Sequence, residues 1–334
     1  MVNQINIFII ILILIFIFFL INKYLTNNDE SPPFPIDVVY TWKGEEVTND
    51  VRTSYNHELQ YSLRSIDLYA PWVNKIYILT DYPKTYPSWI KNDTNKIIMI
   101  DTTETFPHPS YLPNSNSNAI ESTISNIKNL SEHYIYFCDD IFLGKKTKYT
   151  DFFTYDGKAI VDKYVLETSP ILIDENNNIN NIKYPPSSGR MYKHIPIPQI
   201  KSCVQEFYEE YSDYIHWVRM TKNRNNKGFD VCQSNGLNTP CQQIHYPICK
   251  YMYAQNKAIT TDNDESKKCI FVKNKYNNLD YALNRIIVIK PMFFCINDDQ
   301  IDVSKREEAR NTVLQFFEVY FPNKPSFENN QCTF

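Results

Sequence analysis

Hydrophobic and polar positions between residues 36 and 141 predict strands and helices in alternation. Four short runs of apolar and β-branched residues have the length of buried strands: 36–42, 75–81, 96–101 and 133–137. Apolar residues at every third or fourth position predict helices over 57–69 and 117–129. Strands that alternate with helices predict an α/β fold, with a mostly parallel sheet and flanking helices.

The pattern is less regular after residue 153. Apolar positions recur at helical spacing over 203–218 and over 305–320, and both segments are predicted to be helices. The runs 286–289 and 293–296 predict a late pair of strands that returns to the sheet. Polar and Asn-rich stretches predict loops at 174–181, 221–240 and 260–268.

Residues 7–21 form an apolar run near the amino terminus. With Asn6 and Asn22 at the interfaces, this run approaches the ~17–25 residues of a membrane-spanning helix, and no small-residue cleavage site follows it. The pattern favours an uncleaved signal-anchor over a cleaved signal peptide, and therefore a single-pass membrane protein. It divides the chain into an anchor at 1–23, a polar stem at 24–35 and a large domain at 36–334. A type II orientation would place this domain in the lumen of the secretory pathway.

Composition narrows the function classes. The net charge of −4 argues against nucleic-acid binding through bulk electrostatics. The six glycines form neither a P-loop nor a dinucleotide fingerprint, so a bound nucleotide would depend on a metal ion and side chains. None of the eight cysteines forms a Cys-x-x-Cys pair. Four cysteines in the polar third are compatible with disulfides or with free thiols: Cys232, Cys241, Cys249 and Cys269.

Two adjacent aspartates follow the predicted strand 133–137, at the sheet edge where α/β folds bind ligands. Because neighbouring carboxylates repel each other, Asp139 and Asp140 favour a cation such as Mg²⁺ or Mn²⁺, with a solvated turn as the alternative. Asn297 and Asp298 follow another predicted strand, and one metal–phosphate site could gather both pairs. His194 lies at a proline-fixed turn ahead of a helix, where an imidazole could take a proton from a hydroxyl. Four arginines are candidate phosphate clamps: Arg64, Arg190, Arg219 and Arg224.

Four blocks of sequence resemble a known family. The first is Ile36-Asp37-Val38-Val39-Tyr40-Thr41-Trp42, and the second extends from Glu58 to Gly144. The third begins at His194-Ile195-Pro196, and the fourth is Cys295-Ile296-Asn297-Asp298. In this order they resemble the Stealth family of hexose-1-phosphate transferases. That family includes bacterial capsular polysaccharide phosphotransferases and the lysosomal-enzyme N-acetylglucosamine-1-phosphotransferase.

The resemblance implies a glycosyltransferase-A-like nucleotide-sugar fold and identifies residues 36–334 as a phosphotransferase catalytic domain. It implies transfer of hexose-1-phosphate from a UDP-sugar, such as UDP-N-acetylglucosamine, to a glycan or glycoprotein hydroxyl, with release of UMP. The implied catalytic residues are Asp37, His194 as general base and Arg219, with Arg224 as the alternative phosphate clamp. The implied ligands of Mg²⁺ or Mn²⁺ are Asp139, Asp140, Asn297 and Asp298. The implied substrate-binding residues are Thr41, Trp42, Arg64, Asp81, Asn116, Asn118 and Glu121.

Two other functions fit the same sequence. One is a conventional UDP-sugar glycosyltransferase that transfers the sugar alone and releases UDP. The other is a non-catalytic relative that binds a glycan or nucleotide, and the intact acidic residues and His194 argue against it. The chain departs from the family pattern at Lys43-Gly44-Glu45, where a changed loop would alter sugar choice.

Overall fold

The computed structural model describes most of the chain from Ser31 onward and a short segment before it. The described residues are 13–17, 31–45, 56–81, 83–168, 194–222, 244–260, 269–275, 278–298, 300 and 302–329. Residues 13–17 are helical and exposed. Across the described ranges, no helix is both long and apolar enough to cross a bilayer. The rest of the predicted anchor lies outside these ranges, as do Arg190, Arg224 and most of the three predicted loops.

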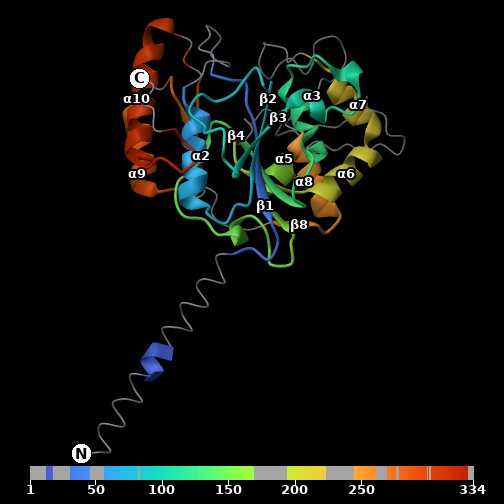
Figure 1. Cartoon of the computed structure of the whole chain (residues 1–334), viewed down its shortest axis with the longest axis horizontal. Coiled ribbons are helices and arrows are strands. Elements are labelled where there is room, and N and C mark those ends of the chain that lie inside the picture. Colours follow the sequence, from blue (N-terminus) through green and yellow to red (C-terminus); the bar gives the residue numbers. More distant parts are fainter. Residues whose placement is uncertain are drawn as a thin grey trace, which may run out of the picture.

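A five-stranded sheet forms the centre of the fold (Figure 1). Its strands, in spatial order, are β3 (Ile97–Asp101), β2 (Ile76–Thr80), β1 (Ile36–Thr41), β4 (His133–Cys138) and β7 (Ile197–Ile200). The first four are parallel, and β7 is antiparallel to β4. The mixed α/β architecture and the four predicted strands are therefore confirmed. His194 precedes strand β7 and not a helix directly, because its prolines lead into a short edge strand.

Two smaller sheets complete the strand pairing. In the first, β10 (Phe293–Asn297) pairs antiparallel with β5 (Ile141–Leu143) and parallel with β9 (Cys269–Lys273). In the second, β6 (Ala159–Val161) pairs parallel with β8 (Ala258–Thr260). Strand β5 follows β4 after a turn of two residues, so β10 is brought next to the end of the central sheet.

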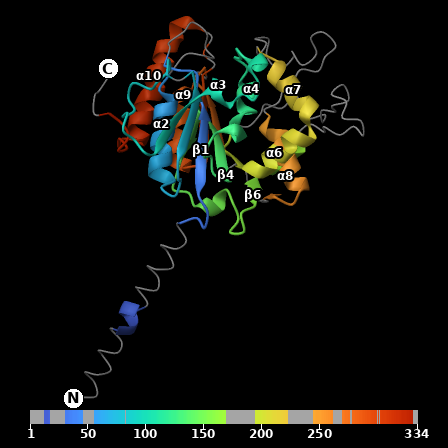
Figure 2. The ribbon, with the colours of Figure 1, turned by 45° about the vertical axis from the view of Figure 1, so that its right-hand side comes forward.

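Helices lie on two sides of the central sheet. Helices α2 (Glu58–Tyr69), α9 (Leu279–Ile289) and α10 (Val303–Tyr320) lie on one side, and α6 (Lys201–Glu210), α7 (Ser212–Met220) and α8 (His245–Ala254) lie on the other (Figures 1 and 2). The shorter helices are α3 (Thr102–Thr105), α4 (Ser117–Glu121) and α5 (Lys163–Thr168), with 3₁₀ turns at Pro109–Tyr111, Ile124–Asn126 and Tyr149–Asp151.

One predicted strand is a helix. The run 286–289 is rich in β-branched residues, but it forms the last turn of α9. The buried residues of α9 are Leu279, Leu283 and Ile286, which recur every three or four positions. This amphipathic period packs α9 against α10 and the small sheet of β5, β10 and β9. The helical spacing over the 11 residues of α9 therefore outweighs the local β propensity of residues 286–289. The predicted helix over 203–218 is divided at Tyr211 into α6 and α7.

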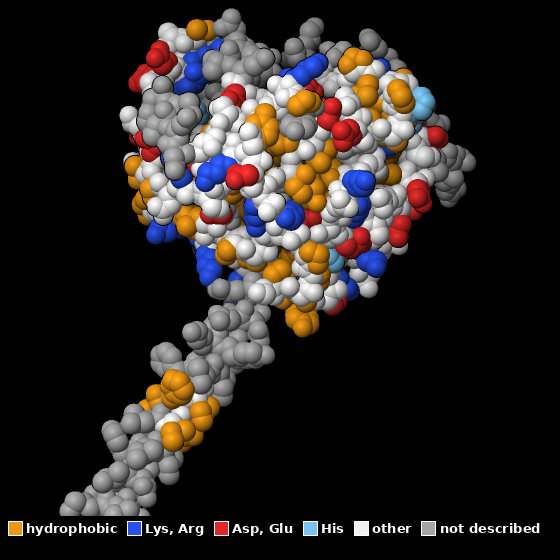
Figure 3. Space-filling model, in the orientation of Figure 1, with side chains coloured by type: hydrophobic (Ala, Val, Ile, Leu, Met, Phe, Trp, Pro, Cys, Tyr) orange, Lys and Arg blue, Asp and Glu red, His pale blue; other side chains and the backbone are white. Residues whose placement is uncertain are grey.

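Most apolar side chains belong to two buried clusters. The larger one surrounds the central sheet, and the smaller one lies between the β5–β10–β9 sheet, α9 and α10. Stacked rings dominate the smaller cluster, in which the centroids of Phe142 and Phe294 are 5.1 Å apart. Lys, Arg, Asp and Glu side chains are interspersed on the face that Figure 3 shows. The two clusters meet beside the turn between β4 and β5, which fixes the position of the acidic residues there.

Candidate active site

The carboxyl edge of the central sheet carries the acidic turn Asp139-Asp140. This turn follows β4 directly, and β1 ends beside it because Thr41 is paired with Cys138. The end of β10 lies against the turn, where the amide of Ile296 donates to the carbonyl of Asp140 over 3.2 Å. Asn297 and Asp298 follow at once, so the two strand–acid segments of the sequence meet at this edge. Their predicted convergence is found in the structure.

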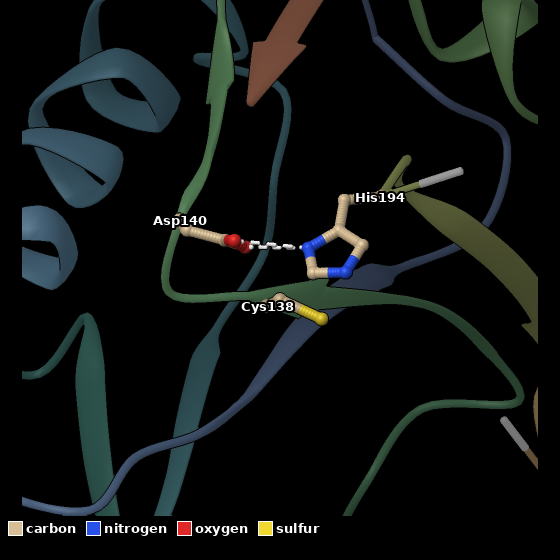
Figure 4. Close-up of side chains that lie close together, drawn as sticks. All are labelled: Cys138, Asp140 and His194. Carbon is tan, nitrogen blue, oxygen red and sulfur yellow. Dashed lines mark hydrogen bonds and ion pairs between the residues drawn. The ribbon is translucent and has the colours of Figure 1, made fainter. Parts of the chain in front are cut away.

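Asp140 and His194 form a hydrogen-bonded pair (Figure 4). Nδ1 of His194 is 2.9 Å from Oδ2 and 3.2 Å from Oδ1 of Asp140. Burial alone would raise the pKa of Asp140, but the neighbouring His194, with hydrogen bonds from Cys295 and Asn297, holds that pKa below its ordinary value. An ionised Asp140 assigns the imidazole proton to Nδ1 and leaves the lone pair on Nε2. This arrangement suits His194 as a general base.

A second group of carboxylates lies next to this pair. Glu58 begins α2, and the side-chain amide of Asn56 donates to Glu58 Oε1 over 2.8 Å and to Asp298 Oδ2 over 2.7 Å. Asn274 also donates to Asp298. Asp139 is close enough to Glu58 for their charges to interact. Carboxylates from α2 and the end of β10 therefore share the amide of Asn56, and Asp139 in the β4–β5 turn lies within electrostatic range of Glu58.

The electrostatics of these carboxylates are unfavourable without a cation. Burial raises the pKa of Glu58 to about 7, and the charge of Asp298 adds to the effect. Burial, followed by the charges of Asp140 and Glu58, raises the pKa of Asp139 well above its ordinary value. Like charges in a poorly solvated place disfavour ionisation, and a divalent cation would reverse this effect.

The types of donor atom suit a hard divalent cation, although among the described residues the three ligand atoms that lie within 4.8 Å of one another are those of Cys138, Asp140 and His194. Asp139, Glu58, Asp298 and Asn297 offer carboxylate and amide oxygens, the ligand atoms that Mg²⁺ and Mn²⁺ prefer. Asp140, predicted as a metal ligand, directs its carboxylate to His194, Cys295 and Asn297 instead. Its role in this arrangement is to orient the imidazole. Glu58 joins the candidate ligands, and the assignment of Asp140 as a metal ligand stays a prediction.

Two segments of the chain match conserved regions of one protein family. Residues 52–161 match "Stealth protein CR2, conserved region 2", and residues 288–333 match "Stealth protein CR4, conserved region 4". The capsular polysaccharide phosphotransferase LcbA of Neisseria meningitidis is 33% identical over an alignment of 313 positions, gaps included, that covers 78% of this chain and 84% of that protein. This chain belongs to the Stealth family.

Other relatives carry similar names. The capsular polysaccharide phosphotransferase fcs1 of Haemophilus influenzae is 28% identical, over 80% of this chain and 79% of that protein. The exopolysaccharide phosphotransferase SCO2594 of Streptomyces coelicolor is 27% identical over 88% of this chain, which spans only 52% of the relative. A solved structure of an active-site mutant of LgtC covers 84% of this chain and 95% of its own, with 10% identity and a TM-score of 0.34. That structural similarity is too low to support an argument about function.

Two residues that the Stealth resemblance implied for the site lie elsewhere. Asp37 is at the amino end of β1, about 13 Å along the strand from Thr41. Its carboxylate accepts hydrogen bonds from the Asn74 side chain and from the backbone amides of Lys75 and Ser131, at 2.8, 3.1 and 2.7 Å. It therefore fastens two loops at the edge opposite the acidic turn, and its predicted catalytic role is not supported by its position.

Arg64 is the second such residue. Its guanidinium is buried and forms an ion pair with Glu328, with an Nε–Oε2 distance of 2.9 Å. A further nitrogen donates to the carbonyl of Phe321 over 3.1 Å. The bidentate pair fastens α2 to the segment after α10, so Arg64 is a packing residue in this fold and not the predicted substrate contact.

Arg219 and the predicted asparagines form a neighbouring buried network. Arg219 donates to the hydroxyl of Ser122 over 3.1 Å and to its carbonyl over 2.7 Å, which joins α7 to the end of α4. Asn116 caps α4 by accepting from the amide of Asn118, and its side chain donates to the carbonyl of Thr221. These contacts explain the burial of Arg219, Asn116 and Asn118. They place no phosphate clamp at the acidic turn.

The remaining predicted substrate residues lie at the same edge of the sheet. The hydroxyl of Thr41 is 3.1 Å from the hydroxyl of Tyr136, and Trp42 is buried directly after β1. Asp81 follows β2 and is exposed. Glu121 is buried, with Oε2 3.3 Å from Nε2 of His245. The ring of His245 in turn stacks on Tyr136, with centroids 4.0 Å apart.

Two residues of the site were not predicted. Glu58 begins a helix, where an acidic residue is ordinarily explained by the helix dipole, so sequence spacing gave no reason to place it with Asp298. Cys138 directly precedes the acidic pair, but it forms no Cys-x-x-Cys motif that would indicate a ligand. Cys249, a candidate for a disulfide, is a free thiol. Cys269 lies at the start of β9, with its thiol 3.9 Å from the carbonyl of His194. Cys232 and Cys241 lie outside the described residues.

Proposed function

We propose that this Stealth chain transfers hexose-1-phosphate from a UDP-sugar to a glycan hydroxyl. The donor is UDP-N-acetylglucosamine or a related UDP-hexose, and the products are a sugar–phosphate–sugar diester and UMP. The observation that carries the proposal is the His194–Asp140 pair next to the carboxylates Glu58, Asp139 and Asp298. The names of the relatives, polysaccharide phosphotransferases, support the same reaction class.

His194 is the general base of the proposed reaction. The acceptor hydroxyl transfers its proton to Nε2, and its oxygen forms a bond to the β-phosphorus of the donor. The bond from this phosphorus to the bridging oxygen breaks, and UMP leaves with that oxygen. Asp140 holds the imidazole in the required tautomer and stabilises the imidazolium that forms. A positioned base of this type contributes typically 10²–10⁴-fold to the rate.

The carboxylates Asp139, Glu58 and Asp298, with Asn297, are the proposed metal-binding residues. Bound Mg²⁺ or Mn²⁺ supplies positive charge that neutralises the pyrophosphate oxygens. Asn56 and Asn274 keep Asp298 oriented through their amide donors. Phosphoryl transfer depends mainly on such positioning and charge neutralisation. We also propose that the acceptor is a glycan or a glycoprotein, and that residues 1–23 anchor the chain in a membrane.

The released nucleotide tests this function. The full chain is incubated with a series of nucleotide-sugars, a glycan acceptor and Mn²⁺, and the nucleotide product is identified by chromatography. UMP is expected, whereas UDP would indicate a glycosyltransferase that moves the sugar alone. His194→Ala should abolish the release, and His216→Ala, which changes an exposed imidazole on α7, is the matched control. A chain that turns over no nucleotide-sugar would be a binding protein.

A further inference from the structure

Three chemically different ligand groups converge beside the acidic turn. The thiol sulfur of Cys138, a carboxylate oxygen of Asp140 and an imidazole nitrogen of His194 all lie within 4.8 Å of one another. Figure 4 shows the three side chains side by side, from the end of β4, the following turn and the segment before β7. The three residues do not form a sequence motif for zinc binding, since His194 is 54 residues away from Asp140. Their proximity results from the pairing of β7 with β4.

This donor set differs from that of the carboxylate group around Asp298. A sulfur, a nitrogen and an oxygen are the ligands of a borderline-soft ion such as Zn²⁺, while Mg²⁺ and Mn²⁺ prefer oxygen alone. Zinc bonds are ~2.0–2.3 Å long, so tetrahedral ligand atoms lie roughly 3.3–3.7 Å from one another. Separations of up to 4.8 Å therefore require only small rotations of the three side chains.

The three groups are accessible to an ion from solvent. The side chain of His194 is 27% exposed and that of Asp140 is 14% exposed, and Cys138 is half-buried. Cys295, whose thiol lies 3.3 Å from Oδ2 of Asp140, provides a second sulfur at the edge of the cluster. Three protein ligands leave one position on a tetrahedral ion for water or a phosphate oxygen.

We propose that Cys138, Asp140 and His194 form a zinc-binding site that is distinct from the carboxylate site for Mg²⁺ or Mn²⁺. Binding releases the thiol proton of Cys138 to solvent and moves the imidazole proton of His194 from Nδ1 to Nε2. Bonds to the ion then form from the Cys138 sulfur, the Asp140 carboxylate and Nδ1 of His194. The ion replaces the Asp140–His194 hydrogen bond. If the proposed transferase function holds, Zn²⁺ inhibits it, because the imidazole that binds zinc no longer accepts the acceptor proton.

Zinc binding is measured on the full chain without any substrate. The protein is stripped with a chelator and titrated with Zn²⁺ in competition with a chromophoric chelator. Wild type is expected to bind one more Zn²⁺ ion per chain with high affinity than Cys138→Ser or His194→Ala does. The affinity at this site should fall by more than the ~10–100-fold that loss of an outer-shell partner causes. Cys203→Ser, which changes a buried thiol in α6, is the matched control and should bind as wild type does.

Cobalt provides an independent signal. Co²⁺ in place of Zn²⁺ should give a thiolate-to-metal charge-transfer absorption in wild type and in Cys203→Ser, and none in Cys138→Ser. Circular dichroism establishes that each variant is folded. If Cys138→Ser does not fold, His194→Ala tests the same site, because His194 is partly exposed and its replacement disturbs the core less.

Equal zinc stoichiometry and affinity in wild type, Cys138→Ser and His194→Ala would overturn the proposal, as would the lack of a tight equivalent in wild type. The titration does not depend on turnover. If the chain releases no UMP, the proposed transferase function is refuted, but the zinc titration still decides whether the zinc site exists. Zinc binding without inhibition of UMP release would refute only the link between the two.

Discussion

Replacing Glu58 by glutamine should remove the pH dependence that this residue gives to stability. Burial raises the pKa of Glu58 from 4.5 to about 7, so the folded, metal-free protein retains this proton when the unfolded chain has lost it. The contribution of Glu58 to stability is therefore neutral below about pH 4.5. Stability then falls as the pH rises to about 7, and the whole penalty is present above that value.

The size of the effect follows from the shift and from the hydrogen bonds. One pKa unit corresponds to ~1.4 kcal/mol, so the rise to about 7 represents on the order of 3 kcal/mol. Glutamine has no charge to lose, but its amide group faces one of the two donors of Asn56 that bind Oε1 and Oε2. The lost hydrogen bond costs about 1 kcal/mol at every pH. Glu58→Gln should be about 1 kcal/mol less stable than wild type near pH 4.5 and about 2 kcal/mol more stable near pH 8.

Urea unfolding of both proteins in the presence of a chelator measures this difference. Mg²⁺ at pH 8 should stabilise wild type and should have a smaller effect on the variant, which lacks one candidate ligand. Glu209→Gln, on the exposed side of α6, controls for the general effect of removing a carboxylate. If Glu58→Gln and wild type differ by the same free energy at both pH values, the pKa of the half-buried Glu58 carboxyl is not raised as described here.

Three further substitutions separate catalytic from packing roles. His194→Ala should lower kcat by 10²–10⁴-fold while the melting temperature stays close to that of wild type; a kcat within a few-fold of wild type would exclude His194 as the base. Arg64→Leu should cost ~3–5 kcal/mol in urea unfolding because it leaves Glu328 buried and unpaired, and Arg64→Leu with Glu328→Leu should regain most of the loss. Stability equal to wild type in Arg64→Leu would contradict this. Asp37→Asn should cost about 1–3 kcal/mol with kcat changed only a few-fold, whereas lost turnover in a protein of unchanged stability would restore its catalytic assignment.

The elements predicted from sequence are those with an unambiguous local period. Strands β1 to β4 have short β-branched runs, and α2 and α10 have apolar residues at helical spacing over several turns. The run 286–289 was misassigned because four β-branched residues fit either structure when they are considered without Leu279 and Leu283. The edge strand β7 was not predicted because Pro196 before it and Pro198 within it indicated a turn, although an edge strand tolerates a missing donor.

Sequence alone could predict the site residues that directly follow strands of the sheet. Asp139-Asp140 and Asn297-Asp298 meet because their strands end at the same edge of the fold. Roles that depend on partners distant in sequence were not predictable. Glu58 joins Asp298 through Asn56, which is 242 residues away from that aspartate, and Arg64 is bound by Glu328, 264 residues away. In both cases the residue type indicates which charge the side chain can carry. Only the tertiary contact shows whether that charge belongs to the active site or to the packing of the fold.

The position of a bound metal and donor tests the central claim most directly. A crystal of the chain with Mn²⁺ and a UDP-sugar, measured by anomalous diffraction, locates the ion and the β-phosphorus. We expect Mn²⁺ to contact the carboxylates of Asp139, Glu58 and Asp298, with the β-phosphorus on the side that faces His194. An ion bound away from these three carboxylates, or a β-phosphate out of reach of the His194 imidazole, would contradict the account.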